Sequence, residues 1–235
     1  PSTFNKQYMR EAGLSSASKK RFEQTGVGLS CGNIWTDIPE AQLDGGMNRT
    51  LDHPDQKPVL LIERIIRASS NENDTVLDVG LGNGIIADYI KKVFKANIEG
   101  VDVVDYNETD IKNTIYDGLY LPFANNSYDC VLILETLHHC TDFKLVLKEA
   151  KRVVKKRVII MEDIYEGIFE KYLLLFHDYI SNIRKGVSCP YNFQSREKWR
   201  GIFTDIGMKI EIEKDYISKF FFFDSKHVIF TLSKG

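Results

Sequence analysis

From residue 75 onward, short apolar runs alternate with segments in which apolar residues recur every three or four positions. The apolar runs predict strands at 75–80, 98–105, 114–121, 128–135, 157–163, 208–217 and 227–234. The helical spacing predicts helices at 85–95, 142–154, 166–184 and 195–207, the last with Ser195 as its N-cap. This alternation indicates an α/β fold with a doubly wound, mostly parallel sheet, and the two closing strands are expected to pair antiparallel.

The first part of the chain has a different pattern. Residues 1–50 are rich in Ser, Gly, Asn and Gln with scattered apolar positions, which predicts an irregular N-terminal arm with one short helix near residues 5–12. The sequence HPDQKP (53–58) then precedes an amphipathic stretch, VLLIERIIRAS, in which Pro58 suits the first helical position. We therefore expect a helix after Pro58, and a domain that extends over residues 51–235.

Length, charge and cysteine spacing narrow the class of protein. A chain of 235 residues is suited to one α/β domain, and 31 basic against 33 acidic residues give a net charge of −2, which argues against a nucleic-acid partner. The four cysteines show no pairing or Cys/His spacing suited to a metal site, so free thiols in the cytoplasm are expected. No apolar run approaches the roughly 20 residues of a membrane span, so no membrane partner is predicted.

The strongest local motif is LDVGLGNG, at the end of the first predicted strand. Gly80, Gly82 and Gly84 permit positive φ and a close approach of a ligand to the backbone, and Asp78 places a carboxylate beside the turn. The spacing fits the dinucleotide-binding fingerprint poorly, and a plain strand-to-helix turn is the alternative interpretation.

Acidic residues follow the next predicted strands as well. Asp102 ends the second strand, where a carboxylate can accept hydrogen bonds from both hydroxyls of a ribose. Asp117 follows the third strand and Glu135 the fourth, so all of these groups are expected at one edge of the sheet. Because the chain lacks a Walker lysine, the pattern indicates a pocket for a nucleoside rather than for phosphate groups.

Four segments carry a family resemblance: VLDVGLGNG, GVDVVD, DGLYLPFANNSYDCV and LETLHHCTDFKLVLKEAKRV. In their order and spacing, residues 75–235 resemble a class I S-adenosylmethionine-dependent methyltransferase of the small-molecule type. The resemblance implies a Rossmann-like, seven-stranded sheet with an antiparallel last strand, S-adenosylmethionine as the cofactor and a small molecule as the methyl acceptor.

The resemblance also implies which residues bind the cofactor. Asp102 would hold the ribose, Asp117 would meet the adenine amino group, and Gly118 with Leu119 would form part of the adenine wall. The complete implied set is Lys57, Asp78, Gly80, Leu81, Gly82, Asn83, Gly84, Asp102, Val103, Asp117, Gly118 and Glu135. Leu81 and Asn83 depart from the small or hydroxyl residues usual in the turn, and VVKKRV replaces the usual Pro-Gly-Gly before the fifth strand.

A second resemblance covers residues 33–77. NIWTDIP, HPDQKP and LLIERIIRASSNENDTVLD resemble the C-terminal part of the amino-methylating DNA methyltransferases, where Lys57 would meet the cofactor carboxylate, although Asp55 replaces the usual hydroxyl residue. The catalytic tetrapeptide of those enzymes contains Pro-Pro, and this chain has no Pro-Pro pair. The chain therefore reads as a mosaic or chimera joined near residues 75–80, of natural or constructed origin.

The candidate catalytic residues are Glu135, His138 and His139, which follow the fourth strand. Glu162 and Asp163 after the fifth strand are further candidates for a base, and His177 would face either a substrate lid or solvent. FFFF (220–223) with Tyr172, Phe176 and Trp199 would line an apolar acceptor pocket, pack in the core or form a dimer surface. Two rivals to small-molecule methylation stay open, namely DNA base methylation and a cofactor-binding scaffold without turnover. The oligomeric state is also open, a homodimer included.

Overall fold

The computed structural model describes residues 73–183, 190–220 and 223–235. The chain divides into two compact units, Pro1–Arg49 and Thr50–Gly235, and every described residue belongs to the second unit. The predicted arm, both predicted N-terminal helices, Asp55 and Lys57 lie outside the described residues. Within the described part of the chain, no helix is long and apolar enough to span a membrane.

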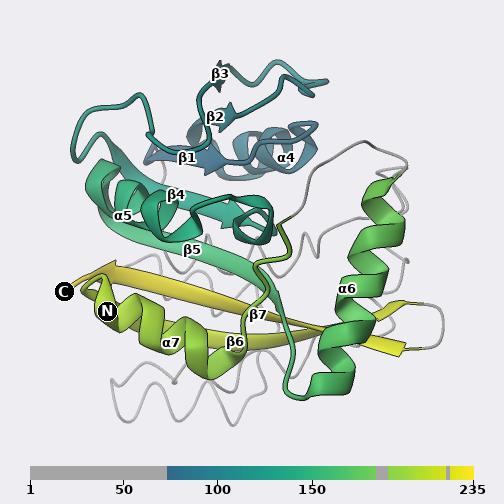
Figure 1. The fold of residues 1–235 in the computed structure, drawn as a ribbon. Coiled ribbons are helices and arrows are strands. Elements are labelled where there is room, and N and C mark those ends of the chain that lie inside the picture. The colour runs from purple at the N-terminus through teal and green to yellow at the C-terminus, as the bar shows by residue number, and fades with distance from the viewer. Residues whose placement is uncertain (1–72, 184–189, 221–222) are drawn as a thin grey trace, which may run out of the picture. The chain divides into compact units, whose positions relative to one another are not determined.

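The described residues form one seven-stranded sheet with the order β3-β2-β1-β4-β5-β7-β6 (Figure 1). The strands are β1 (Thr75–Val79), β2 (Asn97–Asp102), β3 (Asn113–Ile115), β4 (Tyr128–Leu134), β5 (Val154–Ile164), β6 (Met208–Phe220) and β7 (Phe223–Lys234). β1 to β5 pair in parallel, whereas β7 is antiparallel to both of its neighbours, β5 and β6. The predicted α/β class, the seven strands and the antiparallel last strand are confirmed.

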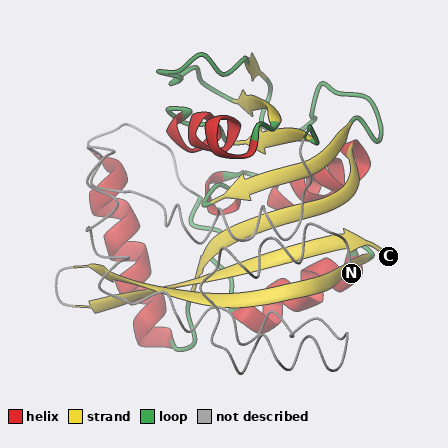
Figure 2. Cartoon of the chain, turned by 180° about the vertical axis from the view of Figure 1, so that it is seen from behind, coloured by secondary structure: helices red, strands yellow, loops and turns green. Residues whose placement is uncertain are grey.

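Helices cover both faces of the sheet, with α4 (Ile85–Phe94) on one face and α5 (Phe143–Val153) and α7 (Arg196–Asp205) on the other (Figures 1 and 2). The 3₁₀ turn η5 (Leu137–His139) follows β4, and α6 (Ile168–Ile183) follows β5. The core between the sheet and its helices contains the fully buried side chains of Val79, Ile133, Ile160, Trp199 and Phe230. Ser195 caps α7 as predicted, because its Oγ accepts a hydrogen bond from the Lys198 N–H at 3.4 Å.

β3 is shorter than the predicted strand at 114–121. The strand ends at Ile115, and Gly118 adopts φ +79° two residues after Tyr116. Oδ1 of Asp117 accepts hydrogen bonds from the N–H groups of Leu119 and Tyr120, both at 2.8 Å. An Asp-Gly pair therefore ends the strand with a turn, and the apolar residues that follow belong to that turn.

β6 and β7 are longer than the predicted strands at 208–217 and 227–234. The pairing of β5 with β7 ends at Ile164 and Lys226, whereas β6 and β7 continue to pair up to Phe220 and Phe223. The closing pair thus extends beyond the rest of the sheet as a two-stranded ribbon. The polar residues in SKFFFFDSK hide this extension from an apolar pattern.

The strand order reverses between β1 and β4, because β2 and β3 lie on one side of this pair and β5, β7 and β6 lie on the other. The loops that leave β1 and β4 therefore diverge at the carboxyl edge of the sheet. In open α/β sheets this divergence is where ligands bind.

Candidate functional site

The glycine turn after β1 meets the loop after β4. Gly80 has φ +80°, and a Cβ atom added there would lie 2.4 Å from both Oγ1 and Cγ2 of Thr136. Gly82 has φ +57°, and a Cβ atom there would meet nothing within 4 Å. Gly80 is thus required by close packing of the two loops, whereas Gly82 leaves backbone open to a ligand.

Leu81 and Asn83, the two unusual residues of this turn, make contacts that stabilise the fold. Leu81 is buried, and its side chain lies against the Cα of Gly100 on β2, where an added Cβ would be 2.6 Å from Cδ2 of Leu81. Oδ1 of Asn83 accepts a hydrogen bond from the N–H of Ile85, at the start of α4, at 3.3 Å. Only the backbone of Leu81 is therefore available to a ligand. Asp78, near the end of β1, is also buried.

Asp102 ends β2 beside the glycine turn. Its Oδ2 accepts a hydrogen bond from the Gly82 N–H at 2.8 Å, and its Oδ1 accepts one from the Val103 N–H at 2.7 Å. A carboxylate offers about four acceptor positions, so these two bonds leave capacity for two hydroxyl donors. The Asp102 carboxylate is half-buried and fits the two hydroxyls of a ribose.

The turn after β3 provides a flat apolar surface next to an acid. A Cβ atom on Gly118 would lie 3.1 Å from Cγ1 of Val103, whose side chain is 52% exposed. The N–H groups of Tyr120 and Leu119 lower the pKa of Asp117, and both of their hydrogen bonds go to Oδ1. Val103 and Gly118 thus fit one face of an adenine ring, and Oδ2 of Asp117 fits its amino group.

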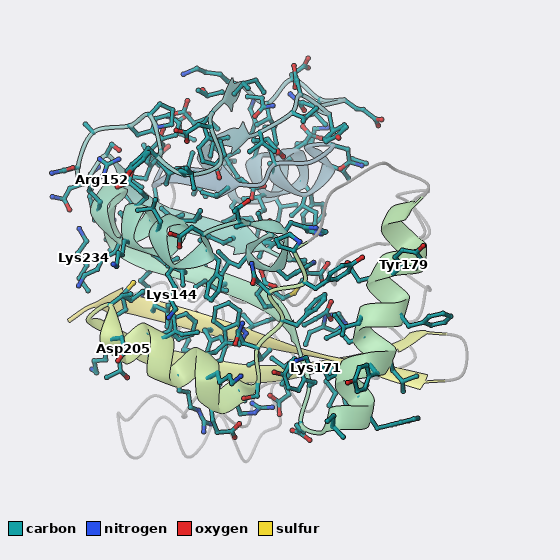
Figure 3. The ribbon with its side chains drawn as sticks, viewed as in Figure 1. Lys144, Arg152, Lys171, Tyr179, Asp205 and Lys234 are labelled. Atoms are coloured by element: carbon teal, nitrogen blue, oxygen red, sulfur yellow. The ribbon has the colours of Figure 1, made fainter. Side chains whose placement is uncertain are left out.

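Arg152 of α5 holds the loop that follows this turn, and its position is labelled in Figure 3. Its guanidinium donates to the carbonyls of Phe123 at 2.7 Å and Leu121 at 2.8 Å, and it pairs with the Glu149 carboxylate. Oε2 of Glu149 also accepts from the Leu121 N–H at 3.0 Å. This pair fixes the loop, and the sequence motifs gave no indication of its role.

His138 is buried beside Glu162 after β4. Its Nδ1 lies 2.7 Å from Oε2 of Glu162, whose other oxygen accepts hydrogen bonds from the N–H groups of Thr136 and Leu137. Burial alone would lower the pKa of His138, but the carboxylate of Glu162, with those of Asp163 and Asp178, raises it to about 9.

A third group approaches the two adjacent histidines from α6. Nε2 of His138 lies 3.9 Å from Oδ1 of Asp178. His138, His139 and Asp178 each offer one potential ligand atom, and these atoms all lie within 4.8 Å of one another. The rings of His138 and His139 are 4.2 Å apart, and Phe193 stacks on His138 at 4.6 Å.

A second imidazole lies at the same edge of the sheet. Nδ1 of His227 on β7 is 2.8 Å from Oδ1 of Asp163 and 3.3 Å from Oε1 of Glu135. Burial would lower the pKa of His227, but Asp163 and Glu135 raise it to about 10. Glu135 adopts φ +52°, a conformation that is rare for a residue with a side chain.

The structure brings most of the predicted site residues to the carboxyl edge of the sheet, within the loops that follow β1 to β4. It adds Asp178, Phe193 and His227, which the sequence patterns did not single out. Asp178 interrupts the apolar stretch LLLFHDYI on a helix, which was the one available sign of it. Trp199 is a core residue rather than part of a pocket wall, and Tyr172 and Phe176 are exposed. The His177 side chain and most of FFFF lie outside the described residues.

Two family models match the chain, and they overlap. The model described as "Methyltransferase domain" matches residues 77–161, and the model described as "DNA methylase" matches residues 1–103. The shared part, 77–103, contains β1, α4 and β2.

Individual relatives are also named as methyltransferases. The Type II methyltransferase M1.MboII of Moraxella bovis is 38% identical over 104 residues, which is 43% of this chain and 39% of that protein. The chain thus spans less than half of that relative. YrhH of Bacillus subtilis is 29% identical over 147 residues, covering 56% of this chain and 77% of that protein.

The fold is shared with solved methyltransferase structures. A structure of a methyltransferase candidate from Bacillus halodurans superposes with a TM-score of 0.61 at 14% identity, covering 74% of this chain and 98% of that one. The chain thus resembles the methyltransferase-domain family over residues 77–161 and the DNA methylases over residues 1–103, and its sheet has the fold of solved S-adenosylmethionine-dependent methyltransferase structures.

Proposed function

We propose that the protein transfers the methyl group of S-adenosylmethionine to a small-molecule acceptor. The observation that carries this proposal is the hydrogen bond between the Gly82 N–H and the Asp102 carboxylate, at 2.8 Å, beside the reversal of strand order. This hydrogen bond holds the Asp102 carboxylate next to the open glycine turn. The carboxylate suits the ribose of the cofactor, and the turn suits its methionine portion.

Three groups of residues would hold the cofactor. Asp102 would bind the ribose hydroxyls, and Val103, Asp117 and Gly118 would bind the adenine. The backbone around Gly82 would lie along the methionine portion, with Asp78 buried beneath that turn. Lys57 stays a prediction for the methionine carboxylate, because it lies outside the described residues.

The acceptor would bind next to the loop after β4. When bound, S-adenosylmethionine supplies an activated methyl group, and most of the catalytic effect of the protein can come from holding the acceptor in line with it. Glu135, His138 and His139 are the proposed groups on the acceptor side, because Thr136 brings their loop into contact with Gly80. A neutral overall charge and the absence of the Pro-Pro tetrapeptide favour a small molecule over DNA.

We also propose that the protein is located in the cytoplasm. Cys130 and Cys140 are free thiols, which suits the reducing cytoplasm. Residues 1–50 would form an arm separate from the methyltransferase domain. Sedimentation analysis would test whether the protein forms a homodimer in solution.

Calorimetry with S-adenosylmethionine and S-adenosylhomocysteine tests the proposal directly. We expect both to bind, and Asp102→Ala to weaken binding by about 1 to 3 kcal/mol through loss of charge-assisted hydrogen bonds. Asp110→Ala, which changes an exposed acid eight residues later, is the matched control and should bind normally. Failure of both ligands to bind the wild-type protein would overturn the proposed function.

DNA base methylation is the second candidate. The match of residues 1–103 to the DNA methylase model favours it. The chain lacks the Pro-Pro catalytic tetrapeptide of those enzymes, so this candidate ranks second.

A further inference from the structure

We propose that His138, His139 and Asp178 form a binding site for a divalent transition metal ion. The three residues come from two elements far apart in sequence, η5 and α6, and each offers one potential ligand atom within 4.8 Å of the other two. Neither family resemblance nor the spacing of histidines and cysteines along the chain indicates such a site.

The distances are suited to a metal after a small adjustment. Nε2 of His138 and Oδ1 of Asp178 are 3.9 Å apart, and the three ligand atoms lie within 4.8 Å of one another. Zinc binds nitrogen and oxygen ligands at about 2.0–2.2 Å, which places neighbouring ligand atoms roughly 3.3–3.6 Å apart. The side chains therefore need to close by about 0.5–1.5 Å to bind a metal ion.

Glu162 prepares His138 for this role. Its carboxylate is almost completely buried and accepts N–H bonds from Thr136 at 2.9 Å and Leu137 at 2.6 Å, so it also accepts the Nδ1–H of His138, 2.7 Å away. This arrangement leaves Nε2 to face Asp178. Metal-binding histidines commonly donate their second ring N–H to a carboxylate in this way, and the partner fixes the tautomer and the orientation of the ring.

The local environment also holds the ligands in place and favours a cation. Phe193 stacks on the His138 ring with an interplanar angle of 20°. Besides Asp178 and Glu162, the carboxylate of Asp163 acts electrostatically on His138. The site is thus a largely buried region in which carboxylates lie around His138.

The composition of the site indicates which metal it takes. Two imidazoles and one carboxylate suit Zn²⁺, Co²⁺ or Fe²⁺ better than Mg²⁺ or Ca²⁺, which prefer oxygen ligands alone. Three protein ligands leave at least one coordination position open, as in catalytic rather than structural zinc sites. This step rests on the proposed function: the open position would bind the methyl acceptor, which is then a small molecule with an oxygen or nitrogen ligand. Both histidines would bind the metal instead of transferring a proton.

Cobalt(II) provides a measurement that does not depend on activity. The full chain, freed of metal by a chelator and of any polyhistidine tag, is titrated with CoCl₂ while its visible absorption is recorded, and with ZnCl₂ in a calorimeter. We expect one equivalent to bind and to produce the d–d bands of a low-symmetry cobalt site. No binding of either ion, or binding without such bands, would overturn the proposal.

Variants separate this site from adventitious binding. Asp178→Asn and His139→Ala should each weaken cobalt binding by about 100-fold or more, and Glu162→Gln by roughly 10- to 100-fold, as for partners behind a ligand. His227→Gln alters another buried imidazole between carboxylates, outside the three ligands, and should change cobalt binding far less than either ligand variant. Equal binding by all variants would place the metal elsewhere and overturn the proposal; circular dichroism establishes that each variant is folded.

Two further measurements keep this inference separate from the proposed function. Acetohydroxamate, a small oxygen ligand, should change the cobalt spectrum by entering the open position, and an unchanged spectrum would mean that no such position exists. Calorimetry with S-adenosylmethionine in the presence of a chelator tests the cofactor alone. Cofactor binding without any metal binding would overturn only the metal site, and the reverse result would overturn only the proposed function.

Discussion

At the scale of single residues, the two glycines of the turn after β1 have different functions. A Cβ atom at Gly80 would collide with Thr136 at 2.4 Å and would also be held at φ +80°, whereas at Gly82 only the backbone strain of φ +57° applies. We expect Gly80→Ala to lower the free energy of unfolding by about 3 kcal/mol and Gly82→Ala by about 1 kcal/mol. Urea denaturation of both variants measures this difference.

The collision at Gly80 can be isolated by a second substitution. Thr136→Ala removes both atoms that the new Cβ would approach most closely. The double variant Gly80→Ala/Thr136→Ala should therefore be more stable than the sum of the two single effects predicts, by roughly 1 kcal/mol. Strict additivity would show that backbone strain, not the contact between the two loops, is the reason for glycine at this position.

His227 gives the protein a pH-dependent contribution to stability. Its pKa is raised to about 10 in the folded state, above the ordinary value of 6.5, by Asp163 and Glu135 acting against the effect of burial. The contribution is thus fully present below about pH 6.5 and is lost as the pH rises through 10. In a comparison of the wild type with His227→Gln, the difference in unfolding free energy should shrink by on the order of 4 kcal/mol between pH 6 and pH 10.

Urea denaturation at a series of pH values measures this difference. Because every other titrating group is common to both proteins, taking the difference removes their contributions. A constant difference over this range would mean that His227 is not charged in the folded protein. Asp163→Asn should reduce the pH dependence in the same direction, since its oxygen lies 2.8 Å from Nδ1 of His227.

At the scale of elements, α5 begins with a side-chain cap. Oδ1 of Asp142 accepts a hydrogen bond from the Leu145 N–H at 3.0 Å, and α5 contributes Val146, Leu147 and Ala150 to the core. Asp142→Ala should lower the free energy of unfolding by about 1 kcal/mol, and Asp142→Asn should lower it by much less, because asparagine also caps helices. Thermal denaturation monitored by circular dichroism measures both; equal losses would show that the cap bond contributes little.

The limits of the helices and strands also show which parts of the fold the sequence pattern predicts. β1, α4 and β4 begin and end within about a residue of their predicted limits, because each is a continuous apolar or amphipathic segment with clear ends. β3 fails at the Asp117–Gly118 turn, where local side-chain hydrogen bonds override the apolar pattern. Apolar residues alone predict a strand here, and they give no indication that the side chain of a neighbouring acid stabilises a turn.

The site residues likewise divide into those that the sequence could predict and those that it could not. Asp102 and Asp117 could be predicted because a parallel sheet brings every strand end to one edge. Asp178 and His227 could not, because their approach depends on where α6 lies and on the pairing of β5 with β7, which sets Asp163 opposite His227. Local patterns therefore predict the cofactor side of the site, whereas the acceptor side depends on tertiary packing.

At the scale of the whole molecule, the two family matches overlap in the part of the sheet proposed to bind the cofactor. Both models include residues 77–103, the segment with the glycine turn and Asp102. A recombination within this shared segment would preserve the cofactor site proposed above. β4 and the part of β5 up to residue 161, on the side proposed for the acceptor, lie only in the methyltransferase-domain match.

This division predicts that the protein does not methylate DNA. The DNA-methylase match ends at residue 103, before β4, and the turn after β4 reads ETLH, without the Pro-Pro tetrapeptide of those enzymes. The net charge of −2 also provides no general attraction for phosphate groups. With methyl-labelled S-adenosylmethionine and duplex DNA at low salt, we expect no more label in the DNA for the wild type than for Asp102→Ala.

Low salt makes this a demanding test, because weak electrostatic binding to DNA is strongest there. Calorimetry on the same preparation shows whether the wild type binds the cofactor, so that a lack of transfer reflects the acceptor side of the site. N6-methyladenine or N4-methylcytosine formed by the wild type and absent with Asp102→Ala would contradict the prediction. That result would mean that residues from the DNA-methylase-like part also determine the acceptor, and that ETLH substitutes for the missing tetrapeptide.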